Sequence, residues 1–327
     1  MTPSVPNALL SPPVMLAPLA GITDLPFRTL VSGFGAGRVV SEMIASGEFL
    51  TARPGTREKA ELGAGIANTS VQLAGRTPEA MAEAARMVEG LGAQVIDINM
   101  GCPAKKVVGG YSGSALLRNL DHACRLIEAV VGAVDVPVTL KTRLGWDDAS
   151  HNAGELAQRA EALGIAMIVI HGRTRCQFYK GSADWSAIRP IKEAVSIPVV
   201  ANGDIVDTSN AREALEQSGA DGVMVGRGAQ GRPWVLAQIA ADIYGTPKPD
   251  IPKGNALVDM VAGHYEAMLD FYGAELGNRV ARKHLGWYMD DAETTPALRK
   301  SILTAKDPKV VLAALPDALL TNVRQAA

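Results

Sequence analysis

Residues 136–143 read VPVTLKTR, and three more runs of this kind follow: MIVIHGR (167–173), IPVVANG (197–203) and GVMVGR (222–227). Each run is rich in Val, Ile and Leu and nearly continuous, which indicates a strand buried on both faces, as in a parallel sheet. Four similar runs precede them: VMLAPLA (14–20), RVVSEM (38–43), SVQLAG (70–75) and VIDINMG (95–101). The sequence therefore predicts eight buried parallel strands.

Amphipathic helical stretches lie between these runs, for example TPEAMAEAARMVEGLGA (77–93), AGELAQRAEALGI (153–165) and TSNAREALEQSGA (208–220). In the first, we expect Thr77 to be the N-cap and Pro78 the first helical residue. Eight strand and helix units over about 230 residues are typical of a TIM (β/α)8 barrel. A doubly wound sheet is the alternative, but no GxGxxG motif follows the first strand.

The chain has 327 residues, whereas one α/β barrel takes about 250, so either two comparable domains or a barrel with an appendage would fit. The Pro- and Gly-rich stretch GTPKPDIPKG (245–254) reads as a linker, and the sequence after it keeps a helical period. We predict a barrel domain over 1–245, a linker over 246–254 and a small all-helical domain over 255–327.

Composition limits the function. The 32 Lys and Arg against 34 Asp and Glu give a net charge of -2, which argues against a surface that binds nucleic acid everywhere but allows a local basic groove. The cysteines Cys102, Cys124 and Cys176 form no CxxC pair, so we expect no disulfide framework and no metal site. With no targeting sequence and no apolar run of membrane length, we expect a cytoplasmic protein. We also expect a monomer.

Polar residues end most of the predicted strands. Active sites of TIM barrels lie at the carboxyl ends of the strands, and an unpaired polar group inside the barrel is costly, so convergence on one ligand is the economical interpretation. These residues are Glu42, Gln72, Asn99, Cys102, Lys141, Arg143, His171, Arg173, Asn202, Asp204, Gly226 and Arg227.

The last two strand ends carry Asn202-Gly203-Asp204 and Gly226-Arg227. Phosphate groups commonly bind at this place in the fold, where glycine N–H groups and a guanidinium are available. An Asn-Gly-Asp sequence is also a good turn on its own. The pair of strand ends therefore predicts a phosphorylated cofactor, with a simple turn as the alternative.

Lys141 and Cys102 stand out among these residues. A lysine within a barrel strand is costly to bury without an anionic partner, which is either a ligand or a carboxylate such as Glu42 or Asp97. Gln72 and His171 could instead be satisfied core residues. Cys102 lies in a Gly-Cys-Pro turn beside two lysines, where a thiol can act as an acid or a nucleophile.

Several motifs together resemble one known family. They are MLAPLAGITDLPFR (15–28), SEM (41–43), VQLAG (71–75), DINMGCPAKKV (97–107), GSALL (113–117), VPVTLKTRLGWDD (136–148), IHGRTRCQFYKGSADW (170–185), IPVVANGDI (197–205), DGVMVGRGAQGRPW (221–234) and RVARKHLGWY (279–288). In this order and spacing they closely resemble the tRNA-dihydrouridine synthases of the bacterial B-type branch. The likeness covers about residues 12 to 310 and implies an FMN-dependent oxidoreductase that uses NADPH or NADH.

The resemblance also implies roles for particular residues. FMN would contact Pro18, Leu19, Ala20, Gln72, Lys141, His171, Asn202, Gly203, Asp204, Gly226 and Arg227. Cys102 corresponds to the catalytic acid, which would protonate C5 of a uracil ring while C6 accepts a hydride, and Asn99 would orient the base. The target uridine, expected in the D-loop of tRNA, must leave its stack to react.

We expect tRNA to contact cations near the barrel mouth and on the helical domain. The candidates are Lys105, Lys106, Arg143, Arg173, Arg175, Arg279, Arg282 and Lys283, although a solvated surface charge is the alternative for each. Where several relatives carry further basic residues, this chain has Val108, Gly109, Gly110 and Tyr111. We expect this loop to hold tRNA less tightly or through aromatic contacts.

Two other functions compete with this hypothesis. A flavin barrel acting on a free pyrimidine would explain the barrel residues but needs no helical platform. A non-catalytic RNA-binding or regulatory protein would use the barrel as a scaffold and would not depend on Cys102.

Overall fold

The computed structural model describes residues 7–51, 61–62 and 68–320. Eight parallel strands form the barrel: β1 (Val14–Leu16), β2 (Arg38–Val40), β4 (Thr69–Ala74), β5 (Ile96–Met100), β6 (Val138–Arg143), β7 (Met167–His171), β8 (Val199–Asn202) and β9 (Gly222–Val225). Strands pair in chain order, β1 also pairs with β9, and β2 pairs with β4, which closes the ring. The predicted TIM barrel is confirmed. A two-residue strand that the sequence analysis did not predict, β3 (Ile44–Ala45), adds to β4.

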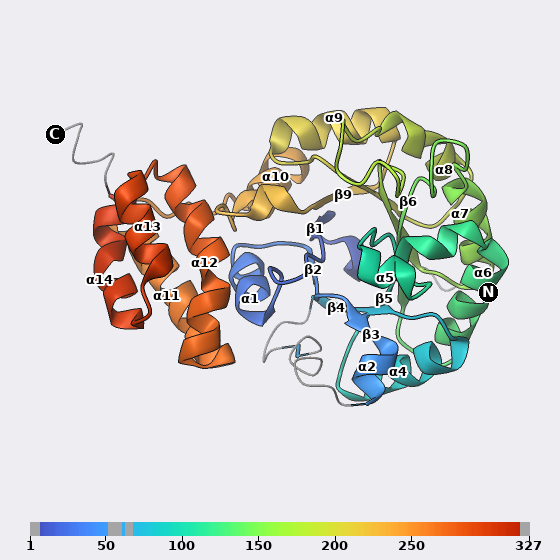
Figure 1. Ribbon diagram of the computed structural model, residues 1–327. Helices are drawn as coiled ribbons and strands as arrows, with labels where there is room; N and C mark the ends of the chain where they lie inside the picture. Colours follow the sequence, from blue (N-terminus) through green and yellow to red (C-terminus); the bar gives the residue numbers. More distant parts are fainter. Residues whose placement is uncertain (1–6, 52–60, 63–67, 321–327) are drawn as a thin grey trace.

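A ring of helices surrounds the strands (Figure 1). It comprises α1 (Leu25–Gly33), α2 (Ser46–Leu50), α4 (Pro78–Gly90), α6 (Leu120–Val131), α7 (Ala153–Ala162), α8 (Arg189–Glu193), α9 (Thr208–Ser218) and α10 (Val235–Tyr244). Helix α4 begins at Pro78 after Thr77, as predicted, but the Thr77 side chain makes no capping hydrogen bond. In α9 the Asp207 carboxylate does accept one, from the Asn210 N–H.

Two apolar layers hold the barrel together. The larger layer fills the space between the strands and the outer helices. The smaller layer lies among the strands and contains Met15, Val40, Met167, Val169 and Met224. Polar side chains such as Asn99, Lys141, His171 and Asn202, described below, lie in the carboxyl-terminal halves of their strands. The barrel therefore presents its polar interior at the end where TIM barrels bind ligands.

A separate helical unit follows the barrel (Figure 1). It consists of α11 (Asn255–Tyr272), α12 (Ala274–Asp291), α13 (Pro296–Thr304) and α14 (Pro308–Leu319). These helices share a core of their own, which includes Val261, Tyr265, Leu285 and Leu315. We propose that this unit and the barrel are the two domains expected from the sequence, joined by residues 246–254.

Aromatic and histidine side chains connect the two units. Phe27 of α1 is fully buried, and its ring centroid lies 5.7 Å from that of His264 and 4.8 Å from that of His284. His264 Nδ1 is 3.0 Å from the Tyr288 hydroxyl. The Tyr272 hydroxyl donates to the Asp24 carboxylate at 3.2 Å. Since Asp24 caps α1 at the barrel mouth, these contacts hold the start of α12 beside that mouth.

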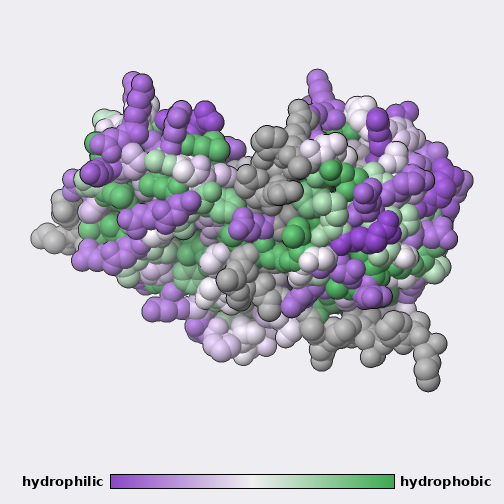
Figure 2. All heavy atoms as spheres, turned by 90° about the horizontal axis from the view of Figure 1, so that it is seen from below, coloured by the Kyte–Doolittle hydropathy of each residue, from purple (hydrophilic) through white to green (hydrophobic). Residues whose placement is uncertain are grey.

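The outer surface is mixed in character. On the face seen from below, hydrophilic side chains cover much of both units, with smaller hydrophobic areas between them (Figure 2). In the described part of the chain, no helix is both long enough and apolar enough to span a membrane.

The junction predicts a pH effect on stability. Burial lowers the pKa of His284 from 6.5 to about 4, so the unfolded chain takes up a proton at this position before the folded one does. The stability that comes from burying a neutral His284 is therefore fully present above pH 6.5, and it is lost as the pH falls from 6.5 toward 4. Between pH 7 and pH 5 we expect the wild type to lose about 2 kcal/mol more stability than the His284→Gln variant.

Urea unfolding at the two pH values measures this difference. Burial has the opposite effect on Asp24, whose pKa it raises to about 6, but Asp24 is present in both proteins and cancels. Equal losses in the two proteins would contradict the assignment.

Candidate functional site

A row of hydrogen-bonded polar side chains crosses β4, β5 and β6 inside the barrel. The Asp97 carboxylate accepts from Gln72 Nε2 and from the Thr139 hydroxyl, both at 2.6 Å. Gln72 Oε1 accepts from Asn99 Nδ2 at 2.8 Å, and Asn99 Oδ1 accepts from the Cys102 N–H at 3.0 Å. Burial raises the pKa of Asp97, while the Thr139 and Gln72 hydrogen bonds oppose the shift. The row ends at the turn that carries Cys102.

Cys102 itself follows β5 at the mouth and is partly exposed. Its carbonyl accepts from the Ser114 N–H at 3.1 Å and from the Ser114 hydroxyl at 2.8 Å, so the turn is fixed on both sides. It is close enough to Lys141 and Arg143 to affect the pKa of each. By contrast, Cys124 is buried and Cys176 is exposed elsewhere.

Lys141 is buried and donates to Asn202 Oδ1 at 2.9 Å, while Asn202 Nδ2 donates to the Met224 carbonyl at 2.8 Å. Among the described residues, Lys141 does not form the alternative ion pair with Glu42 or Asp97. Burial and the nearby Arg143 lower the pKa of Lys141 to about 8. The ammonium group therefore stays charged at neutral pH without a carboxylate in direct contact, which favours an anionic ligand.

The ends of β8 and β9 form a compact charged cluster. The Asp204 carboxylate accepts from Arg173 at 3.0 and 2.5 Å, from Arg227 at 2.9 Å and from the Ala183 N–H at 2.8 Å. Burial raises the pKa of Asp204, but these hydrogen bonds and positive charges lower it overall. The Asp204 carboxylate is thus already paired with two guanidinium groups. It would act on a bound phosphate only indirectly, by orienting Arg227, whose side chain is 54% exposed.

The backbone between these charges comes close to the ring of His171. At Gly203 φ is +114°, and an added Cβ would lie 2.8 Å from Ala183 Cβ and 3.0 Å from His171 Cδ2. Only glycine fits this position. On the opposite side, an added Cβ at Gly226 would lie 3.8 Å from Leu19 Cδ2, so the loop after β1, which carries Pro18, Leu19 and Ala20, borders the same strand ends.

His171 is neutral, because burial and then the charges of Lys141, Arg143, Arg173 and Arg227 lower its pKa well below the usual range. Arg173 Nη1 lies 3.4 Å from His171 Nε2. Since a guanidinium only donates, Nε2 is the acceptor and Nδ1 carries the proton.

Tyr179 was missed by the sequence analysis. Its side chain is 54% exposed, its ring lies 6.3 Å from that of His171, and the guanidinium carbons of Arg143 and Arg227 lie 5.5 and 5.4 Å from its centroid. An exposed ring next to two cations is a good stacking surface for a base. The feature of the sequence that could have identified Tyr179 is an aromatic residue next to a lysine, Lys180.

Asp97 and Thr139 were missed as site residues as well, although the signal was present. Asp97 and Asn99 are two residues apart on β5, as Thr139 and Lys141 are on β6, so each pair lies on one face. Gln72, predicted to contact the cofactor, is fully buried, and the partners seen for its amide are Asp97 and Asn99.

The predicted tRNA-binding cations fall into two groups. Lys105 and Lys106 on α5 (Lys105–Gly109) and Arg279 and Lys283 on α12 are exposed, Arg282 is half-buried, and Arg175 lies against the rings of Trp146 and Phe178. Arg143 and Arg173 form the second group, because both are buried. Arg143 donates to the carbonyls of Gly101, Thr174 and Phe178, so it positions loops rather than offering a surface charge.

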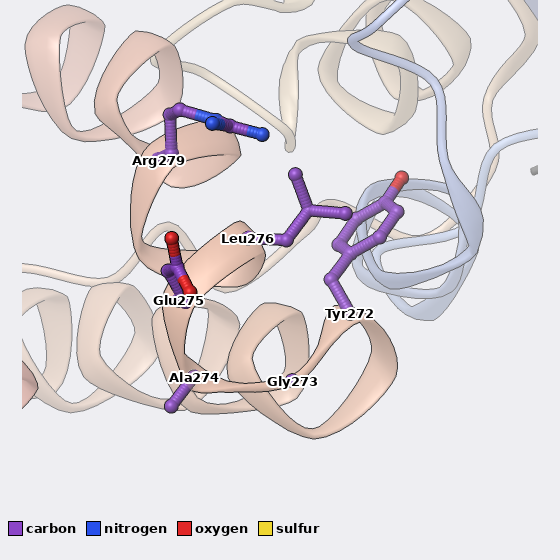
Figure 3. A pocket seen from close by; sticks show the side chains of 6 residues that line it. All are labelled: Tyr272, Gly273, Ala274, Glu275, Leu276 and Arg279. Atoms are coloured by element: carbon purple, nitrogen blue, oxygen red, sulfur yellow. The ribbon is translucent and has the colours of Figure 1, made fainter.

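An open depression of about 490 Å³ lies at the turn between α11 and α12 (Figure 3). Tyr272, Gly273, Ala274, Glu275, Leu276 and Arg279 line it. In Figure 3 the Tyr272 side chain points toward α1, which agrees with its hydrogen bond to Asp24. A Cβ added at Gly21, in the loop after β1, would lie 3.2 Å from Lys283 Nζ. Lys283 of α12 therefore borders the barrel mouth.

The donors gathered at the mouth suit a phosphorylated anionic cofactor. They comprise the Lys141 ammonium, the Nδ1–H of His171, the Arg227 guanidinium and the close backbone at Gly203. The described residues contain no group of three or more His, Cys, Asp or Glu side chains arranged to hold a metal ion.

The chain is similar to known proteins in sequence and in fold. A family model described as dihydrouridine synthase matches residues 15–324. A probable tRNA-dihydrouridine synthase of Rhodobacter capsulatus is 63% identical over 320 residues, which cover 97% of this chain and 98% of the relative. tRNA-dihydrouridine synthase B of Vibrio cholerae is 49% identical over 291 residues, covering 88% and 89%.

A solved structure of a morphinone reductase variant in complex with tetrahydroNAD shares the fold, with a TM-score of 0.51 at 14% identity over 74% of this chain and 89% of that one. At that identity the likeness concerns the fold alone. The family model and the relatives cover nearly all of the sequence, and the chain belongs to the dihydrouridine synthase family.

Proposed function

We propose that this chain reduces the C5=C6 double bond of a uridine in tRNA to dihydrouridine, with FMN as cofactor and NADPH or NADH as reductant. The observation that carries the proposal is the partly exposed Cys102 thiol, fixed at the mouth of the barrel within reach of the Lys141 and Arg143 charges. Membership in the family and the names of the relatives support it.

Each residue has a role in this reaction. The flavin, when bound, would supply the hydride that C6 of the uracil accepts. Cys102 would donate its thiol proton to C5 on the same base, so that one hydride and one proton saturate the bond. Lys141, the neutral His171, Asn202, Gly203, Gly226 and Arg227 would hold the cofactor, and Pro18, Leu19 and Ala20 would border it.

The base would be oriented by Asn99 and Tyr179. Asn99 uses its oxygen for backbone N–H groups and one N–H for Gln72, which leaves one N–H for a uracil oxygen. A flipped uridine, in the D-loop by resemblance, would stack on Tyr179. The exposed cations of α5 and α12 would bind the tRNA backbone. We further propose that the enzyme acts as a monomer in the cytoplasm.

Cys102→Ala tests the proposed acid directly. We expect dihydrouridine formation in tRNA to fall about 100- to 10,000-fold, the usual contribution of a positioned acid, while flavin binding persists. Mass spectrometry of the tRNA product measures the loss, and Cys124→Ala, a change at a buried thiol of the outer helix α6, is the matched control. Full activity of Cys102→Ala, or equal wild-type activity on free uridine and tRNA, would refute the assignment.

Lys141 predicts a pH dependence of cofactor binding. Because burial and Arg143 lower its pKa to about 8, the ammonium charge is present at pH 7 and is lost as the pH rises through 8. We expect the Kd for FMN to rise about 10-fold between pH 7 and pH 9, measured by quenching of flavin fluorescence. Lys141→Met should bind weakly and lack this rise. An unchanged pH profile in that variant would rule Lys141 out as the cause.

The cations of α12 predict a separable effect on tRNA. Replacing Arg279 and Lys283 together by alanine should raise the KM for tRNA about 10-fold and reduce its salt dependence, because phosphate contacts are lost. Flavin reduction by NADPH should not change. Arg86→Ala, an exposed cation on the outer helix α4, provides the control. Equal effects of both changes would mean that α12 is not a specific tRNA contact.

A further inference from the structure

We propose that Asp97 is a positioning residue, which acts through Gln72 and Asn99 to hold the Cys102 turn in its reactive orientation. This inference rests on the proposed function and extends it, because it gives Gln72 and Asn99 a further role as the link between Asp97 and the Cys102 turn. The hydrogen bonds run without a gap from Asp97 Oδ2 to Gln72 Nε2, from Gln72 Oε1 to Asn99 Nδ2, and from Asn99 Oδ1 to the N–H groups of Gly101 and Cys102.

The direction of this row is determined at its Cys102 end. Backbone N–H groups only donate, so the Asn99 oxygen must face them and its NH2 group must face Gln72. The Gln72 oxygen then accepts from Asn99, and the Gln72 NH2 group is left facing residue 97. Whatever stands at position 97 must therefore present an acceptor to Gln72.

Asp97 meets this requirement. One carboxylate oxygen accepts from Gln72, and the other accepts from the Thr139 hydroxyl. The match is specific because Asn99 lies beside Lys141 in the β5–β6 register, and Asp97 lies between Gln72 and Thr139.

Burial makes the direction consequential. Asp97 is 3% exposed, Gln72 0% and Asn99 7%, so water has almost no access to replace a missing partner. Two acceptors placed face to face would remain mismatched or force the row to rearrange, and the Cys102 turn is where the rearrangement would appear.

The row can be reversed by exchanging two side chains. Asn99→Asp alone keeps an acceptor toward Cys102 but points a second acceptor at the Gln72 oxygen. Asp97→Asn alone keeps the present direction, because the amide oxygen can face Gln72 and the amide NH2 can face the Thr139 oxygen. In the double variant every bond is satisfied again, with the Gln72 amide turned over: the amide at position 97 donates to Gln72, and Gln72 donates to the carboxylate at position 99.

The experiment is this double-mutant cycle in the flavin-loaded full-length enzyme. For each protein we would measure kcat and KM for tRNA. Hydrogen–deuterium exchange of the peptide around residues 99–104 would be measured in the same four proteins. We expect Asn99→Asp to lower kcat about 10- to 100-fold with little change in KM, and to speed amide exchange at the turn. Asp97→Asn should cost about 3-fold. The double variant should restore the slow exchange, and its kcat should exceed that of Asn99→Asp by about 5-fold or more, while the N–H that Asn99 offers to the base stays absent in both.

The double variant is decisive because it and Asn99→Asp carry the same new charge at position 99. If both are equally impaired in kcat and equally fast in exchange, the direction of the row does not hold Cys102 and the proposal is wrong. A loss in Asp97→Asn as large as that in Asn99→Asp would also overturn it. Recovery of slow exchange without recovery of kcat would support the positioning role and indicate that Asn99 also contacts the base.

Failure of the proposed function would look different. A wild-type protein that reduces no tRNA uridine would remove the kinetic comparison, but the exchange measurement would still decide whether the row holds the turn. Melting temperatures of the four proteins identify any variant that is merely unfolded.

Discussion

The chemistry of this protein depends on the need to pair every polar group inside the barrel. Methionine and valine side chains such as Met15 and Val169 fill one part of the interior. Asp97, near the amino end of β5, begins a row of polar side chains that leads through Gln72 to Asn99, and Lys141 donates to Asn202. Where water is nearly excluded, each donor must meet an acceptor. This condition orients the amides and places the Cys102 thiol and the Lys141 ammonium at the open end.

The polar groups at the mouth of the barrel also give it a positive charge. Three buried cations, Lys141, Arg143 and Arg173, and the exposed Arg227 lie near the neutral His171 and add to the lowering of its pKa by burial. The nearby carboxylate of Asp204 is shared between two of them. A surplus of positive charge in a confined site favours an anionic ligand. The chain as a whole carries a net charge of -2, so its affinity for RNA has to come from local groups of cations and not from overall charge.

Much of this arrangement follows from the sequence, since eight apolar runs with helical stretches between them define the barrel, and the polar residues that end those runs define the mouth. The burial of individual arginines could not be predicted from the sequence. Arg143 and Arg173 look like exposed cations in the sequence, yet their guanidinium groups are buried against carbonyls and Asp204. Period-2 spacing places Asp97 and Asn99 on one face, but the link through Gln72 depends on the register of β4 and β5. The aromatic contacts of Phe27 with His264 and His284 join segments more than 230 residues apart, beyond the reach of local patterns.

The central claim is that this chain converts tRNA uridine to dihydrouridine through Cys102. The most direct measurement maps dihydrouridine by mass spectrometry in tRNA from a host strain that lacks the protein, with the wild-type gene or a Cys102→Ala gene restored. We predict that one position lacks the modification in the deletion strain, regains it with the wild-type gene and stays unmodified with the variant. Identical maps in all three strains would contradict the account.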